Sequence, residues 1–74
     1  MLPVKELLIV KAGSQYLRFL PEGHQICSFD KASVFPLDQV AQVRDHMRRA
    51  YEDGIADIEL HKLTIIEEPY SEAI

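Results

Sequence analysis

One amphipathic helix constrains the fold of this 74-residue chain more than any other feature. The segment from Leu37 to Asp53 repeats apolar residues at spacings of three and four, which places them on one helical face. Pro36 precedes the segment with a backbone angle suited to a helix start, and Gly54 follows it as a natural C-terminal cap. The predicted buried stripe consists of Leu37, Val40, Val43, Met47, Ala50 and Tyr51. The predicted solvent face holds Gln42, Asp45, His46, Arg49 and Asp53.

Sequence typical of β-strands lies on both sides of this helix. Residues 4–11 and 16–20 are predicted to form two strands, and the alternation of residues 24–29 is compatible with a third. The last strand is expected over residues 55–66. Its apolar phase changes near residues 61–62, which predicts either a bulge there or burial of both faces at its end.

The resulting order, β-β-(β)-α-β, predicts an α+β fold with two layers. One amphipathic helix is expected on one face of a three- to four-stranded, mostly antiparallel sheet. The length allows a single domain over residues 1–74, with residues 69–74 as a loose C-terminal tail. The predicted core is Leu8, Val10, Leu17, Phe19, Phe35, Val40, Val43, Met47, Tyr51, Ile58 and Leu60.

A single helix covers one face of such a sheet and leaves the other face uncovered. On that uncovered face we expect four exposed apolar side chains: Leu7, Ile9, Leu63 and Ile65. Exposed apolar surface of this kind is typical of a protein contact. These four are therefore the predicted partner-binding residues, and a homodimer is the simplest form of the contact.

Cysteine usage and the first residues bear on where the protein works. Cys27 is the only cysteine, so no disulfide can form within the chain, which is typical of a reducing cytoplasm. Residues 1–4 lack the basic start of a secretory leader. The apolar run at residues 7–10 is far too short to cross a bilayer. The sequence thus predicts a cytoplasmic protein without a membrane-spanning segment.

Charge is distributed unevenly along the chain, whose net charge is −4. Residues 1–51 carry a balance of +2, and residues 52–74 carry a balance of −6. An acidic segment repels nucleic acid phosphates and favours basic protein surfaces, although most charge of this kind simply keeps a surface solvated. A partner with a basic surface is therefore one of the open alternatives.

Three arginines gather on the predicted helix at positions 44, 48 and 49. Arg44, Arg48 and Arg49 form a charged face that could hold phosphates. Acidic residues are interleaved with them, however, and the chain has no helix-turn-helix pattern and no aromatic platform for RNA. The cluster is therefore interpreted as a self-paired, solvated face, and nucleic acid binding remains a weaker alternative.

Candidate catalytic and metal-binding residues are sparse. His24, Cys27 and Asp30 form the nearest approach to a nucleophile group, but the sequence offers no helix start or glycine-rich cradle to activate the thiol. The three histidines, His24, His46 and His61, fall on different elements and lack the short paired spacing of zinc ligands. The sequence predicts no catalytic residue, cofactor, metal or small-molecule ligand.

Three segments together resemble a layout found in small bacterial and phage-borne proteins. They are YLRF at 16–19, FDKASVF at 29–35 and LTIIEE at 63–68. In that layout a strand pair is followed by an Ala-x-x-Phe anchor that leads into a helix. The resemblance covers most of the chain and implies a β-β-(β)-α-β fold with a non-enzymatic role, and it assigns no site residue.

These observations predict a small, acidic, non-enzymatic domain that binds another protein or associates with itself. One alternative is an accessory or inhibitor protein of the phage or prophage type, which presents acidic surface to a host target. The other is a weak nucleic acid binder that uses the three helix arginines.

Overall fold

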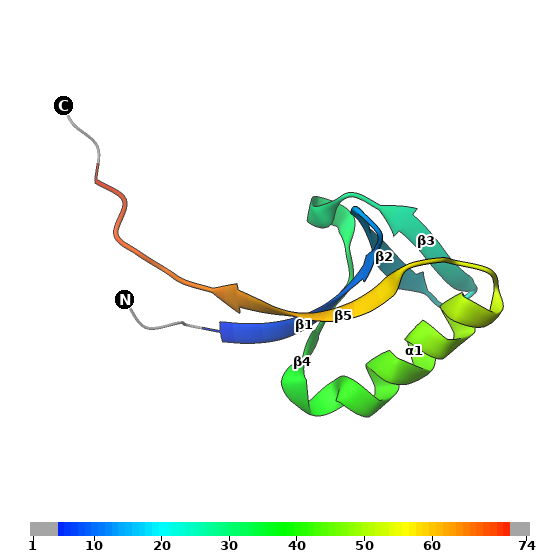
Figure 1. The fold of residues 1–74 in the computed structure, drawn as a ribbon. Coiled ribbons are helices and arrows are strands. Elements are labelled where there is room, and N and C mark those ends of the chain that lie inside the picture. Colours follow the sequence, from blue (N-terminus) through cyan, green and yellow to red (C-terminus); the bar gives the residue numbers. More distant parts are fainter. Residues whose placement is uncertain (1–4, 72–74) are drawn as a thin grey trace.

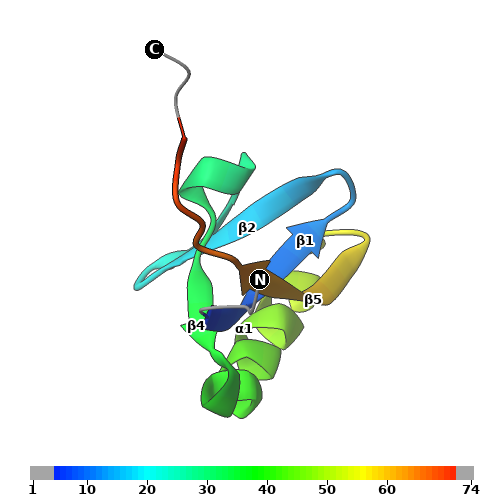
Figure 2. The ribbon, with the colours of Figure 1, turned by 90° about the vertical axis from the view of Figure 1, so that its left-hand side faces the viewer.

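The computed structural model describes residues 5–71 and contains one helix packed on an antiparallel sheet (Figures 1 and 2). In chain order the elements are β1 (Lys5–Ala12), β2 (Gln15–Leu20), β3 (Gly23–Cys27), the 3-10 turn η1 (Phe29–Lys31), β4 (Val34–Pro36), the 3-10 turn η2 (Leu37–Gln39), α1 (Val40–Glu52) and β5 (Ile58–Ile65). The predicted α+β architecture is confirmed. The sheet has five strands, whereas three or four were predicted, because Val34–Pro36 also pairs.

Strand β1 lies at the centre of the sheet. Its whole length pairs with β5, from Lys5 opposite Ile65 to Ala12 opposite Ile58. Its other edge is divided between two strands, since β2 pairs only with the last two residues of β1 and β4 pairs with residues 7–9. The ladder with β5 is unbroken, so the bulge, one of the two alternatives for the last strand, is wrong. The other alternative, burial of both faces at the end of the strand, is also wrong, because Thr64 and Ile65 are exposed.

Ser33, in the segment that leads into β4, is hydrogen-bonded to β2. Its N–H donates to the carbonyl oxygen of Leu17 at 3.2 Å, and its Oγ accepts from the N–H of Phe19 at 2.9 Å. These bonds satisfy the backbone of β2 at the point where β2 no longer pairs with β1. The chain therefore passes from beside β2 to beside β1 while Ser33 pairs with two backbone groups of β2.

The predicted third strand is confirmed but ends earlier than expected. Strand β3 pairs with β2 from Cys27 opposite Tyr16 to Gly23 opposite Leu20. Phe29 has already left the strand and belongs to η1, where its ring meets that of Tyr16 edge to face at 5.4 Å. The aromatic contact holds η1 against the start of β2.

The core lies between the sheet and α1. Leu8, Val10 and Leu17 from the sheet are buried together with Val43 and Ala50 from the helix. The other predicted core residues pack partly buried against this cluster, with one exception. That exception is Tyr51, which is 74% exposed.

The helix face is slightly different from the one predicted. Ala50 occupies the inward position of the last turn, and Tyr51 lies about 100° further around the helix, in solvent. Leu37 is 41% exposed because it belongs to η2, before the α-helical period begins. His46, predicted to face solvent, is half-buried and stacks on the ring of Phe19 with 4.7 Å between centroids.

The predicted C-terminal cap of the helix is confirmed at Gly54. This residue has φ +91°, a left-handed conformation that glycine adopts without a steric penalty. Its N–H donates to the oxygen of Tyr51 at 3.0 Å, and the N–H of Ile55 donates to the oxygen of Ala50 at 3.1 Å. These two bonds define a Schellman motif. Ile55 then packs against the core, so the cap also directs the chain toward β5.

The ends of the chain are only partly described. Residue 4, predicted to begin the first strand, and residues 72–74 of the predicted tail lie outside the described residues. Residues 66–71 follow β5 without helix or strand. Within residues 5–71, no helix combines the length and the apolar character that crossing a membrane requires.

The contrast between two helix residues provides a test of the packing. We expect Val43→Ala to lower the free energy of unfolding by about 2 kcal/mol, because it removes fully buried methyl groups and leaves a cavity. Tyr51→Ala is the matched control and should change it by less than about 0.5 kcal/mol, since that side chain is exposed. Urea denaturation measures both. Equal losses in the two variants would contradict this placement of the helix.

Candidate functional site

The sheet face turned away from α1 is here called the far face. Its apolar side chains are less exposed than the sequence predicts. Leu7 and Ile9 are buried, with exposed fractions of 9% and 3%, so the expectation that they are exposed is wrong. Each lies in the central strand between a residue of β4 and a residue of β5, and these neighbours cover its sides. Leu63 is half-buried, and only Ile65 remains well exposed, at 41%.

Strand β5 provides the most accessible surface near these residues. Among residues 5–71 it pairs only with β1, so its outer edge carries unpaired backbone groups along eight residues. Figure 1 shows that the end of β5 and the start of β1 project beyond α1. Ile65 is at this projecting end, followed by Ile66, which is 49% exposed.

Charged side chains on β5 are paired within the chain. His61 Nε2 lies 3.0 Å from Glu59 Oε1, and Lys62 Nζ lies 3.1 Å from Glu6 Oε2 on β1. The hydrogen bond from His61 lowers the pKa of the Glu59 carboxyl. Residues 63–66 carry no charge at all. Edge strands are usually protected from pairing by charges, and this part of the edge has none.

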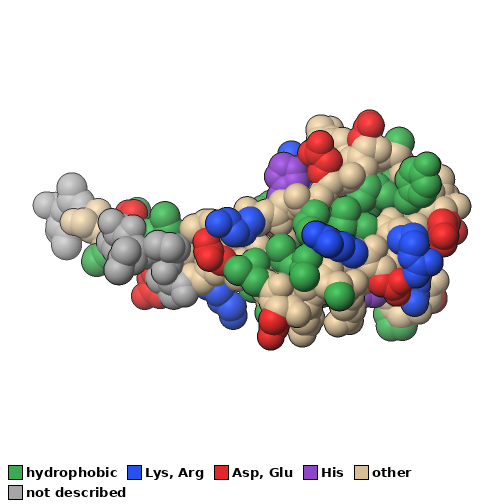
Figure 3. Space-filling model, turned by 60° about the horizontal axis from the view of Figure 1, so that its bottom comes forward, with side chains coloured by type: hydrophobic (Ala, Val, Ile, Leu, Met, Phe, Trp, Pro, Cys, Tyr) green, Lys and Arg blue, Asp and Glu red, His purple; other side chains and the backbone are tan. Residues whose placement is uncertain are grey.

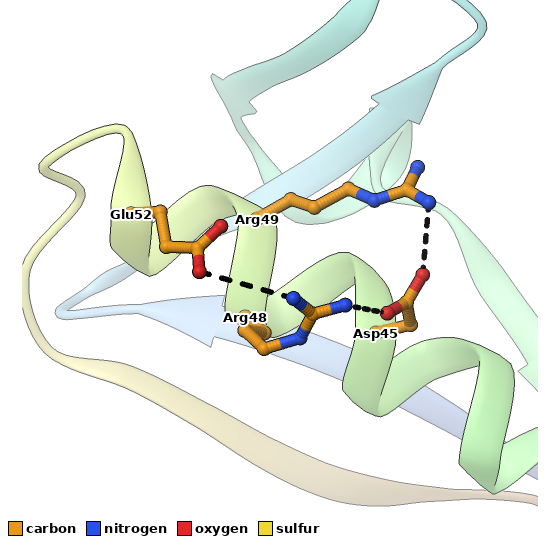
Figure 4. A network of polar contacts seen from close by, with 4 residues as sticks. All are labelled: Asp45, Arg48, Arg49 and Glu52. Atoms are coloured by element: carbon orange, nitrogen blue, oxygen red, sulfur yellow. Dashed lines mark hydrogen bonds and ion pairs between the residues drawn. The ribbon is translucent and has the colours of Figure 1, made fainter.

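The helix arginines form a network with acidic residues rather than a free basic surface (Figure 4). Asp45 accepts a hydrogen bond from Arg48 and lies 3.0 Å from Arg49, while Arg48 also approaches Glu52 at 3.8 Å. In Figure 3 basic and acidic side chains accordingly lie side by side at the right-hand end of the face it displays. Arg44 takes part in none of the ion pairs found among residues 5–71.

A groove that the sequence did not reveal runs between the β2–β3 turn and α1. It consists of two adjoining cavities of about 490 and 410 Å³, and both are lined by Phe19, Leu20, Pro21 and His46. The only signal in the sequence was the turn at residues 21–23, which directly precedes His24. The distance between this turn and the helix depends on how β3 packs, and no local sequence pattern encodes that packing.

The two ends of the groove differ in character. At one end Phe35 stacks at an angle on His46, with 5.8 Å between ring centroids. At the other end His24 Nε2 lies 3.2 Å from Asp53 Oδ2, which links β3 to the end of α1. The first end is therefore aromatic, and the second is polar and charged.

His24 and Cys27, the nearest approach to a nucleophile group in the sequence, do not lie together. His24 reaches Asp53 at the end of α1, on the helix side of the sheet. Cys27 is half-buried and opposite Tyr16, and strand alternation turns its side chain to the other face. The structure does bring His24 and His46 to one cavity, although they are far apart in sequence. Within residues 5–71, no three side chains among His, Cys, Asp and Glu are grouped to hold a metal ion.

Comparison of the chain with protein-family models, with curated proteins and with solved structures finds no match. The layout noted in the sequence therefore stays a hypothesis. Any assignment of function depends on the surfaces described above.

The arginine network has a measurable consequence for Asp45. The hydrogen bond from Arg48 is the main cause that lowers the pKa of the Asp45 carboxyl, and Arg49 and Arg48 add electrostatic attraction. Any stabilisation from this group is present above the ordinary carboxyl pKa and is lost as the pH falls through the lowered value. We expect Arg48→Gln to raise the pKa of Asp45, as measured by NMR titration of its carboxyl carbon. Arg44→Gln is the matched control, and an equal rise in that variant would argue against a specific contact.

Proposed function

We propose that this chain is a small cytoplasmic protein-binding domain that pairs with a second copy of itself through the outer edge of β5. The observation that carries the proposal is the projecting end of β5, where an unpaired strand edge coincides with uncharged, exposed residues. An edge of this kind is a template for another strand. The lone Cys27, without a disulfide partner in the chain, supports the cytoplasmic setting.

Charge complementarity favours one register for this pairing. We consider an antiparallel contact about a twofold axis through Ile65. A residue that lies a given number of positions before Ile65 in one copy is then opposite the residue that lies the same number of positions after Ile65 in the other copy. Lys62 of one copy is then opposite Glu68 of the other, and this ion pair occurs twice. Thr64 is opposite Ile66, and the two Ile65 side chains meet at the axis.

The same register also places an apolar pair of side chains beyond each ion pair. Leu60 is half-buried in one copy and would be opposite Tyr70, whose side chain is 86% exposed. Burying such groups stabilises association by about 25 cal/mol per Å² of apolar surface. Residues 66–68, which have no regular structure in the single chain, would gain backbone hydrogen bonds on pairing, whereas Pro69 has no N–H to donate.

A charge swap tests both the association and its register. We expect Ile65→Lys to weaken the dimer roughly tenfold or more, because it places two cations together at the axis. Lys62→Glu and Glu68→Lys should each weaken it by about three- to tenfold, and the double variant should recover the affinity of the parent. Sedimentation equilibrium over micromolar concentrations measures the dissociation constants.

Tyr51→Lys is the control for these variants, since it introduces the same cation on α1, away from β5. It should associate as the parent does. A parent that is monomeric at high micromolar concentration would refute the proposal. A dimer that Ile65→Lys disrupts, but that the double charge swap fails to restore, would refute the register alone.

A further inference from the structure

The geometry points to a second binding site, independent of the β5 edge: the groove between the β2–β3 turn and α1 receives an arginine side chain from a peptide segment of a partner protein. The groove combines an aromatic wall with an acidic end, and this combination selects the ligand. Its larger cavity, of about 490 Å³, is in the size range of sites for small ligands.

The acidic end of the groove carries more negative than positive charge. Glu22 from the β2–β3 turn and Glu52 and Asp53 from the end of α1 line it. Arg49 is the one arginine or lysine among the residues lining this cavity, and its guanidinium lies 3.0 Å from Asp45, a carboxylate that it shares with Arg48. The excess of carboxylates disfavours a phosphate or carboxylate ligand and favours a cation.

The acidic side chains remain accessible to a ligand. Glu52 is 59% exposed, and its contact with Arg48 is long, at 3.8 Å. Asp53 is 68% exposed even though one of its oxygens lies near His24. A carboxylate has two oxygens and several lone pairs, so Asp53 can hold a second donor without losing the first.

The aromatic wall favours arginine over lysine. The rings of His46 and Phe19 are nearly parallel, with 18° between their planes and 4.7 Å between centroids. Phe35 adds a third ring at 5.8 Å from His46. A planar guanidinium lies flat on aromatic faces and presents several donors in a fixed fork to carboxylates, whereas an ammonium group contacts an aromatic face only as a compact point charge and has no such fork. The apolar residues Leu20 and Pro21 offer contact to the aliphatic part of the side chain.

The arrangement of elements holds the groove open. One wall consists of β2, its following turn and the start of β3, and the other is α1. The contact between His24 on β3 and Asp53 at the end of α1 joins the two walls at one end. Stacking of His46 on Phe19 joins them in the middle. Because these contacts exist in the single chain, the site requires no second copy and differs in this from the proposed dimer contact.

NMR titration with two matched peptides tests this inference. The probes are N-acetyl-leucyl-glycyl-arginine amide and the same peptide with citrulline, which has the shape of arginine without its charge. We expect saturable shifts of the backbone amides of Gly23, Arg49 and Glu52 with the arginine peptide, and a dissociation constant at least about fivefold higher for the citrulline peptide. Glu52→Gln should remove most of this preference, and Glu67→Gln, a matched change in the tail, should preserve it.

Two further measurements separate this site from other interpretations. Ile65→Lys, which is designed to disrupt the dimer, should bind the arginine peptide as the parent does, so failure of the dimer proposal leaves this one intact. Equal affinity for the two peptides, or no saturable shift at millimolar peptide, would overturn the inference. Shifts of the same amides at lower concentrations of inorganic phosphate would also overturn it and assign the groove to an anion.

Discussion

The fold depends on a single constraint, which is that β1 is paired along both of its edges. Its eight residues include four consecutive buried ones, Leu7 to Val10, and a strand buried on both faces needs neighbours on both sides. One edge is satisfied by β5 over its full length. The other edge is shared by β2 and β4, and this division bends the sheet and brings the chain from Ser33 back across it.

The two candidate binding surfaces follow from this arrangement. Because β5 is paired only on the side of β1 within residues 5–71, its outer edge is free in that part of the chain, and its last residues extend beyond the helix. Because β2 leaves β1 after two residue pairs, the β2–β3 turn approaches the C-terminal half of α1 and forms the groove there. The two surfaces are therefore built by different strands. A substitution in one surface makes no direct contact with the other.

Local compensation of charge reduces the positive field around the most basic part of the sequence. Asp45 lies one helical turn before both Arg48 and Arg49, so all three side chains meet on one side of α1. Exposed pairs of this kind add little to stability, but they lower the net field that a phosphate would encounter. At the end of the same helix Glu52 and Asp53 reverse the balance of charge, which gives the groove its acidic end.

The sequence by itself determined the elements whose signals are local. Spacing predicted the helix and its inward residues Val43 and Met47, and Gly54 predicted its end through a backbone conformation that favours glycine. Hydrophobic residues also identified nearly all of the core, because burial is their main source of stabilisation.

Tertiary structure alone decided the features that depend on neighbours distant in sequence. Leu7 and Ile9 have the pattern of an uncovered sheet face, yet in the fold they are buried, in a strand that has a neighbour on each side. His46 has the position of a solvent-exposed residue, and only the approach of β2 places Phe19 against it. The periodicity of a sequence gives the direction of a side chain relative to its own element, whereas its burial and its ligands depend on which other elements lie opposite.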